Sequence, residues 1–207
     1  FRMLESWLAV SCDEQGWDHQ VEPTAIELID ASVGSFTTTY RAAPERIFTT
    51  LPAVGEGHFE NRFVGEWLLY GVRSRYGRPP EEDDEAGSHV LMTVPLGSPE
   101  AARALPLGHE ITRIEALGTD AIATGYRDQS GLHVSYLDLA DTARLADQAH
   151  LANRYESESR SHAFNATIYP EADGLLGLPT VRSEADSGRR WWRSDNSAIS
   201  FLRFSEN

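Results

Sequence analysis

Short apolar runs separated by Gly, Pro and Asp follow one another along most of this chain. The clearest stretch is 110–139, EITRIEALGTDAIATGYRDQSGLHVSYLDL, where turn residues at 118–120 and 127–131 divide three such runs. Runs rich in Val, Ile, Thr and Tyr are typical of β-strands, and Gly or Asp between them is typical of hairpins. The pattern predicts three consecutive antiparallel strands. A fourth is expected over 143–151, although its Ala, Leu, Arg and Gln would also suit a short helix.

The same plan recurs along the chain, in approximate units spanning 1–51, 61–107, 110–151 and 161–207. The second strands of the last three units begin at Trp67, Ala121 and Leu175, which gives 121 − 67 = 54 and 175 − 121 = 54. Trp7 to Trp67 is 67 − 7 = 60. This period is near the roughly 40–50 residues of known propeller repeats. The sequence therefore predicts an all-β fold, a β-propeller of about four visible four-stranded blades, possibly part of a larger propeller.

Several predicted strands are apolar on both faces, for example WLLYG at 67–71 and VLMTV at 90–94. Strands packed between two neighbouring sheets have this pattern, whereas a strand with one face in water alternates apolar and polar residues. The pattern favours stacked blades. A β-sandwich with accidental self-similarity is the alternative fold.

The composition narrows the classes of partner. The chain has 207 residues and a formal net charge of −14, which argues against a nucleic-acid partner or an anionic membrane surface. No apolar run approaches the roughly 20 residues of a membrane span. The single cysteine, Cys12, excludes an internal disulfide and a Cys-rich metal site.

Common catalytic and cofactor motifs are missing: there is no Gly-x-Ser-x-Gly, His-Glu-x-x-His or Cys-x-x-Cys and no phosphate loop with a Lys. Ser159, Ser161 and His162 suggest a hydrolase, but adjacent strand residues face opposite ways, so Ser161 and His162 would not pair. The acidic and histidine residues within 13–19 are better explained as a solvated loop than as a metal site. We therefore predict no catalytic residue, no metal and no cofactor.

A basic residue followed by an apolar one recurs in the predicted first strands, at Arg2, Arg62, Arg113 and His162. First strands lie nearest the axis of a propeller, so these residues could form a ring that holds an anionic ligand. In the alternative, each residue pairs with an acid of the neighbouring blade and locks adjacent sheets together; the candidate acids are Glu60, Glu66, Glu110 and Glu115.

Two long loops interrupt the repeat. The first, RPPEEDDEAG at 78–87, is acidic and is expected to be well solvated. The second, 183–197, concentrates side chains that are enriched in interface hot spots: Arg189, Arg190, Trp191, Trp192 and Arg193. We predict that these five residues bind a partner. The two indoles could instead fold back over their own blade.

The segment 131–179, GLHVSYLDLADTARLADQAHLANRYESESRSHAFNATIYPEADGLLGLP, resembles the exported proteins of bacteria and archaea that carry a C-terminal β-propeller domain. RFVGEWLLYGV at 62–72 and TRIEALGTDAIATGY at 112–126 look like the recurrent hairpins of that family, and the likeness covers roughly 45–182. The resemblance implies a propeller in a secreted or cell-envelope protein. It transfers no catalytic residue.

These observations favour a non-catalytic propeller module of an exported bacterial protein that binds a protein or carbohydrate partner. The alternative is an enzyme that uses the central mouth of the propeller, with the basic ring as a clamp for an anionic substrate. Four units leave a seam unless the ring closes on itself, so further blades from a longer chain, or a second copy of this one, are also expected partners.

Overall fold

The computed structural model describes the following residues: 2–8, 11–13, 16–18, 23–30, 47–54, 58–73, 89–158, 164–168, 173–182 and 197–205. These residues are almost all β-strand, and none of them lies in an α-helix. A 3-10 turn, Pro99–Ala101, follows the third strand of the second sheet. None of the described residues belongs to a helix that is long and apolar enough to cross a membrane.

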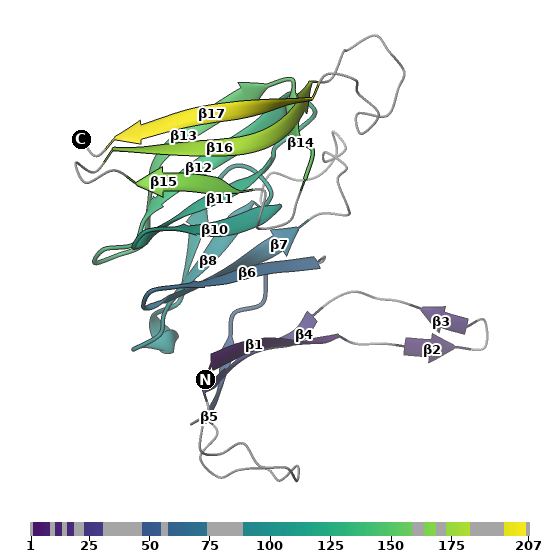
Figure 1. Ribbon diagram of the computed structural model, residues 1–207. Coiled ribbons are helices and arrows are strands. Elements are labelled where there is room, and N and C mark those ends of the chain that lie inside the picture. Colours follow the sequence, from purple (N-terminus) through teal and green to yellow (C-terminus); the bar gives the residue numbers. More distant parts are fainter. Residues whose placement is uncertain are drawn as a thin grey trace, which may run out of the picture.

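Four antiparallel sheets follow one another along the chain (Figure 1). The first sheet contains β1 (Arg2–Leu8), β4 (Pro23–Asp30) and β5 (Ile47–Leu51), in that order. The second contains β6 (His58–Val64), β7 (Trp67–Arg73), β8 (Val90–Pro95) and β9 (Arg103–Pro106). The third contains β10 (Arg113–Leu117), β11 (Asp120–Tyr126), β12 (Gly131–Asp138) and β13 (Arg144–Ala152). The fourth contains β14 (Arg154–Glu156), β15 (Asn165–Ile168), β16 (Asp173–Arg182) and β17 (Ser197–Ser205).

The second and third sheets confirm the predicted repeat. Each consists of four consecutive strands joined as a meander, and β11 pairs with β12 from Ala121 opposite Leu137 to Tyr126 opposite Leu132. The segment that could have been a helix is the strand β13. Its residues would suit a helix, but pairing with β12 from Arg144 to Ala152 stabilises the strand instead.

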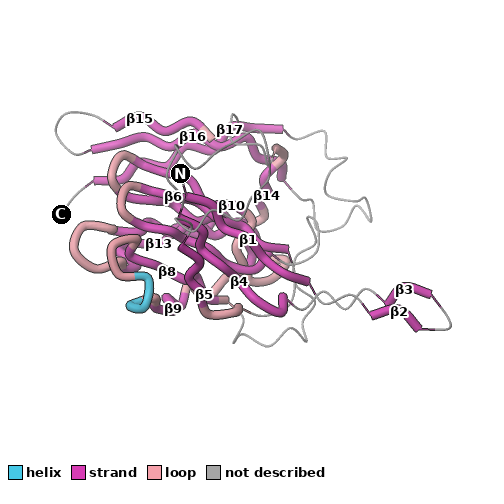
Figure 2. Tube along the Cα trace, turned by 90° about the horizontal axis from the view of Figure 1, so that it is seen from below, coloured by secondary structure: helices cyan, strands magenta, loops and turns pink. Residues whose placement is uncertain are grey.

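The first and fourth sheets differ in detail from the prediction. The repeat places a second strand from Trp7 and so predicts a break between residues 4 and 7, but β1 runs unbroken from Arg2 to Leu8 and pairs with β4. No Gly, Pro or Asp lies between residues 4 and 7 to start a turn. After β1, the strands β2 (Ser11–Asp13) and β3 (Gly16–Asp18) form a hairpin that lies apart from the other strands (Figure 2). In the fourth sheet, two short strands, β14 and β15, share the same side of β16.

The hairpins that open the second and third sheets have the same turn. Gly65 and Gly118 each occupy the first position of a two-residue loop, between Val64 and Trp67 and between Leu117 and Asp120. Their φ angles are +53° and +64°, which glycine adopts without strain. Because the turns match, the strands on either side can be compared position by position.

Each pair of neighbouring sheets encloses its own hydrophobic core. The core between the second and third sheets includes Leu69, Leu91, Ile114 and Ala123, and the core between the first and second includes Ile26, Leu28, Leu68 and Tyr70. Leu68 and Leu69 are adjacent and both fully buried, because the second sheet is covered on both faces. This confirms the interpretation of strands that are apolar on both faces. A third core, around Ile122, Leu132 and Leu176, joins the third and fourth sheets.

The four sheets form an open row, with the first sheet at the bottom of Figure 1 and the fourth at the top. The described residues therefore give a stack of repeated antiparallel sheets, and they do not close a ring.

Trp67 links the second sheet to the third through its indole. Its Nε1–H donates a 2.7 Å hydrogen bond to the carbonyl oxygen of Leu139, a residue that is only 3% exposed. We expect Trp67→Phe to lower the free energy of unfolding by about 1–3 kcal/mol, since the buried carbonyl loses its partner. Urea unfolding would measure this, and an unchanged midpoint would show that the bond contributes nothing.

Candidate functional site

The inner strands of the second and third sheets meet at a buried ion network. Arg62 Nη2 on β6 lies 2.7 Å from Glu115 Oε2 on β10, and Arg113 Nη1 lies 3.7 Å from the other oxygen, Oε1, of the same carboxylate. The side chains of Arg113 and Glu115 are 3% and 6% exposed, whereas Arg62 is 40% exposed. Glu115 thus accepts one cation from each of two sheets.

Arg113 continues the network into the fourth sheet. Its Nε lies 3.1 Å from Glu156 Oε1 on β14, and its Nη2 donates a 2.6 Å hydrogen bond to the carbonyl oxygen of Glu158. The hydroxyls of Thr112 and Thr124 donate to the two oxygens of Glu156, at 3.3 and 3.4 Å. Burial raises the pKa of Glu156, and the charge of Arg113 opposes that rise.

The strand registers show how the network arises from the repeat. Arg62 lies two residues before Val64, which ends its strand at the turn, and Glu115 lies two residues before Leu117, which ends the next. Arg62 and Glu115 therefore occupy equivalent positions of consecutive sheets. Arg113 is two residues further from its turn, so Arg62 and Arg113 do not occupy equivalent positions. The predicted ring had treated them as equivalent.

Of the other two predicted ring residues, the structure describes only Arg2. Arg2 pairs with Asp30 of its own sheet, at 3.4 Å. His162 lies outside the described residues, as do Ser159 and Ser161 and the five predicted partner-binding residues at 189–193. The structure brings together Arg62 and Arg113 through Glu115, and it gives both of them carboxylate partners in a neighbouring sheet. An incoming anion would have to displace Glu115 or Glu156.

A column of imidazoles, which the sequence did not predict, crosses the third sheet. The ring of His133 stacks between those of His109 and His150, with centroids 5.6 and 4.4 Å apart. His133 and His150 are direct cross-strand partners on β12 and β13, whereas His109 precedes β10. Burial lowers the pKa of His109 to about 4 and also lowers that of His133, with smaller contributions from His89 and the neighbouring rings.

Hydrogen bonds determine which nitrogen of His109 carries the proton. Its Nδ1 lies 2.6 Å from the carbonyl oxygen of Glu110, which can only accept, so Nδ1 is the protonated nitrogen. Nε2 then accepts from Ser135 Oγ, also at 2.6 Å. Gln148 Nε2 completes the chain by donating to Ser135 Oγ and to the carbonyl oxygen of Leu107. With this assignment, each donor in the chain from Gln148 through Ser135 to His109 has an acceptor.

Ser135 and His109 have the contact distance of a nucleophile and its base, but both are 0% exposed. The serine hydroxyl also accepts from Gln148, so no carbonyl substrate can reach it without opening the sheet. The pair contributes to packing in this conformation. Within the part of the chain that the structure describes, no group of three or more His, Cys, Asp or Glu side chains could hold a metal ion.

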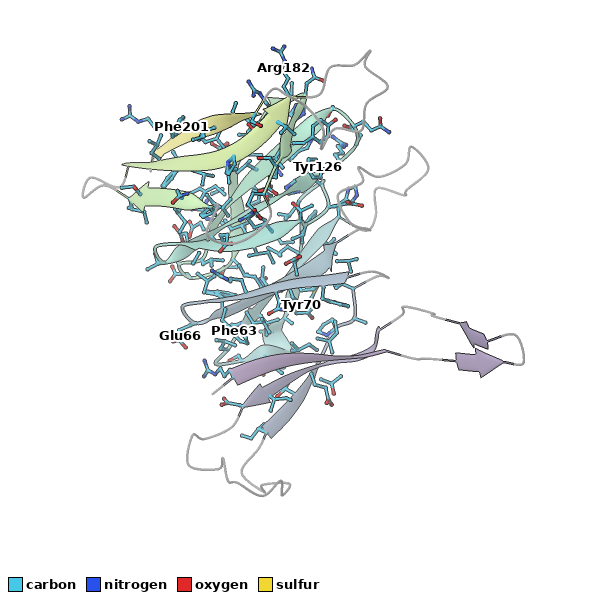
Figure 3. The ribbon with its side chains drawn as sticks, turned by 45° about the vertical axis from the view of Figure 1, so that its right-hand side comes forward. Phe63, Glu66, Tyr70, Tyr126, Arg182 and Phe201 are labelled. Atoms are coloured by element: carbon cyan, nitrogen blue, oxygen red, sulfur yellow. The ribbon has the colours of Figure 1, made fainter. Side chains whose placement is uncertain are left out.

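The outer face of the fourth sheet presents apolar side chains to solvent. Ile199 and Phe201 of β17 are 62% and 64% exposed. They lie opposite Pro179 and Gly177 of β16, and the ring of Phe201 lies against Gly177. Phe201 is labelled on this end sheet in Figure 3. The opposite face of the same sheet packs into the third core through Leu176 and Leu178. The outer face of the fourth sheet, around Phe201, is therefore the clearest exposed apolar surface among the described residues.

Fold and site together define an all-β protein of stacked antiparallel sheets, several of them four-stranded, and the described residues leave an apolar face exposed at one end. No family model, curated protein or solved structure matches this chain. The resemblance to exported propeller proteins accordingly stays a prediction.

Proposed function

We propose that this chain is a non-catalytic, β-propeller-type module of an exported bacterial protein, and that it binds a protein partner through the outer face of the fourth sheet. The observation that carries the proposal is the exposure of Ile199 and Phe201 on a sheet whose other face is packed. Exposed apolar patches on folded proteins are typical of interaction sites. The exported location rests on the sequence resemblance.

The apolar character of this face favours a protein over a carbohydrate. Ile199 lies opposite Pro179, and Arg203 lies opposite Leu175. A sugar site needs several converging polar groups next to an aromatic ring, whereas aliphatic neighbours suit the apolar centre of a protein interface. Arg203 and the exposed Asn165 and Thr167 of β15 would then form a polar rim.

The alternative, an enzyme with a basic clamp, has less support. The cations available for a clamp, Arg62 and Arg113, already contact Glu115 and Glu156. His109, whose pKa is strongly perturbed, is enclosed with Ser135 away from solvent. The repeated four-stranded sheets support the propeller part of the proposal. A complete propeller would require further strands to close the open row.

The test begins with a photo-crosslinking amino acid at position 201, used to capture the partner from an envelope extract of the source organism. We then expect Phe201→Ser to weaken binding of the purified partner by roughly 30-fold, the effect of losing one hot-spot side chain. Ile47→Ser is the matched control, because Ile47 is equally exposed, at 65%, but lies on the first sheet.

Titration calorimetry on both variants separates the outcomes. Equal losses for Ile47→Ser and Phe201→Ser would show non-specific adhesion and would contradict the proposal. Binding of purified oligosaccharides that depends on Phe201 would replace the protein partner with a carbohydrate. Turnover of an anionic substrate that is lost in Arg62→Met would favour the enzyme.

A further inference from the structure

The last strand of the fold, β17, is a long and regular edge. It pairs with β16 through nine consecutive residue pairs, from Val181 opposite Ser197 to Asp173 opposite Ser205, without a register shift. Among the described residues its other side pairs with no strand. An unpaired strand of this length offers a row of backbone donors and acceptors to another chain.

The corresponding edges of the second and third sheets are protected. Strand β9 has only four residues and ends at Pro106. Strand β13 has a register shift opposite Tyr136 and Leu137, and it carries Arg144, Asp147 and His150. Short length, proline, irregular pairing and charge are the usual means by which proteins prevent edge-to-edge association. Strand β17 has none of them apart from the single charge of Arg203.

The sequence of β17, SAISFLRFS, is complementary to itself when it is read around Ser200. In an antiparallel pair centred on Ser200, Ile199 faces Phe201, Ala198 faces Leu202 and Ser197 faces Arg203, each twice. Cross-strand pairs of an aromatic with a β-branched side chain stabilise antiparallel sheets. All described pairings in the fold are antiparallel, and a two-fold axis through Ser200 would continue that pattern.

We infer that β17 pairs with β17 of a second copy of this chain, antiparallel about Ser200, and joins two fourth sheets into one continuous sheet. The charge distribution agrees with this site. The chain has 32 acidic and 18 basic residues, so two copies repel each other, but β17 contains no acidic residue. The dimer is therefore expected to strengthen as salt screens the remaining charges.

This inference goes beyond the proposed function and does not depend on it. Pairing at the edge uses the backbone of β17 and leaves the outer face open. Two copies of that face would then lie side by side in one sheet, which would raise the affinity for a partner that has two matching sites.

Light scattering on the intact chain, over about a hundredfold range of concentration, tests the inference, since a two-state dimer gives a concentration-dependent mass. We expect twice the mass of the chain at high concentration, and a dissociation constant at least about tenfold higher in Phe201→Lys and in Ile199→Lys. Two variants are used because Phe201 also covers Gly177, so its replacement alone could affect folding. Circular dichroism verifies that each variant is folded.

Thr167→Lys is the matched control, since Thr167 is exposed on β15, on the other side of β16 from β17. This variant should leave the dimer intact but should disturb the outer face. If it weakens partner binding without changing the mass, the result tests the proposed function and leaves the dimer inference unaffected. In a Cys12→Ser background, Ser200→Cys should form a disulfide between copies on oxidation. A monomer at every concentration, or a dimer that persists in folded Ile199→Lys, overturns the inference.

Discussion

Replacing Arg113 with Met is expected to lower the free energy of unfolding by about 3–5 kcal/mol, the usual cost of removing one partner from a buried ion pair. Arg113 is 3% exposed and is the cation that contacts Glu156, which is itself 7% exposed. Without the guanidinium, the carboxylate of Glu156 keeps, among the described residues, the hydroxyls of Thr112 and Thr124. Chemical unfolding at pH 7 measures the effect.

The control is Arg62→Met, which removes the other cation on Glu115. Its side chain is 40% exposed and Glu115 keeps Arg113, so we expect a loss of about 1 kcal/mol or less. Acid should reduce the defect of Arg113→Met. The pKa of Glu156 is raised in the folded protein, so falling pH protonates this carboxyl in the native state before it does so in the unfolded chain. A loss that is equal in both variants would contradict a buried inter-sheet lock.

The repeat and its strands could be predicted because their signals are local. Turn residues at Gly65 and Gly118, and apolar runs such as WLLYG, do not depend on distant parts of the chain. Leu68 and Leu69 even indicate that both faces of the second sheet are covered. Closure of a ring is different, since it depends on how the sheets are placed along the row, and no local pattern specifies that.

The ion network could have been predicted more accurately. Aligning the two hairpins on Gly65 and Gly118 places Arg62 at the position of Glu115, a cation against an anion, rather than at the position of Arg113. The prediction missed this because it matched a basic residue followed by an apolar one in each first strand, and did not compare how far each basic residue lies from its turn. Glu156 was not predictable from the period, since β14 is an additional strand in the fourth sheet.

The histidine column depends on pairings between distant residues. The pairing of β12 with β13 shifts its register between Tyr136 and Leu137, and His133 lies opposite His150 because of that shift. The sequence carries no signal for it. His109 joins them from outside the strands. Seven single histidines in the sequence therefore gave no indication that three of their rings would stack.

The buried histidine is expected to make the protein less stable in weak acid. The pKa of His109 falls from 6.5 to about 4 on folding, chiefly because burial disfavours the imidazolium. Between these two pH values the unfolded chain binds a proton that the folded chain excludes, so stability is complete above pH 6.5 and is lost as the pH falls toward 4. The expected loss is about 1.4 kcal/mol per pH unit, or roughly 3 kcal/mol in all. Glu156, whose pKa is raised, acts in the opposite direction.

Two variants isolate the contribution of His109. His109→Asn cannot titrate, so the variant should be less stable at neutral pH but should lose less stability than the parent protein between pH 6.5 and 4. Ser135→Ala removes the donor to Nε2 while it leaves the ring buried, so stability should fall by about 1 kcal/mol with the pH dependence retained. Urea unfolding at several pH values compares the three proteins. If His109→Asn retained the full dependence, other groups would be responsible for it, and protonation of the enclosed ring would not limit stability in acid.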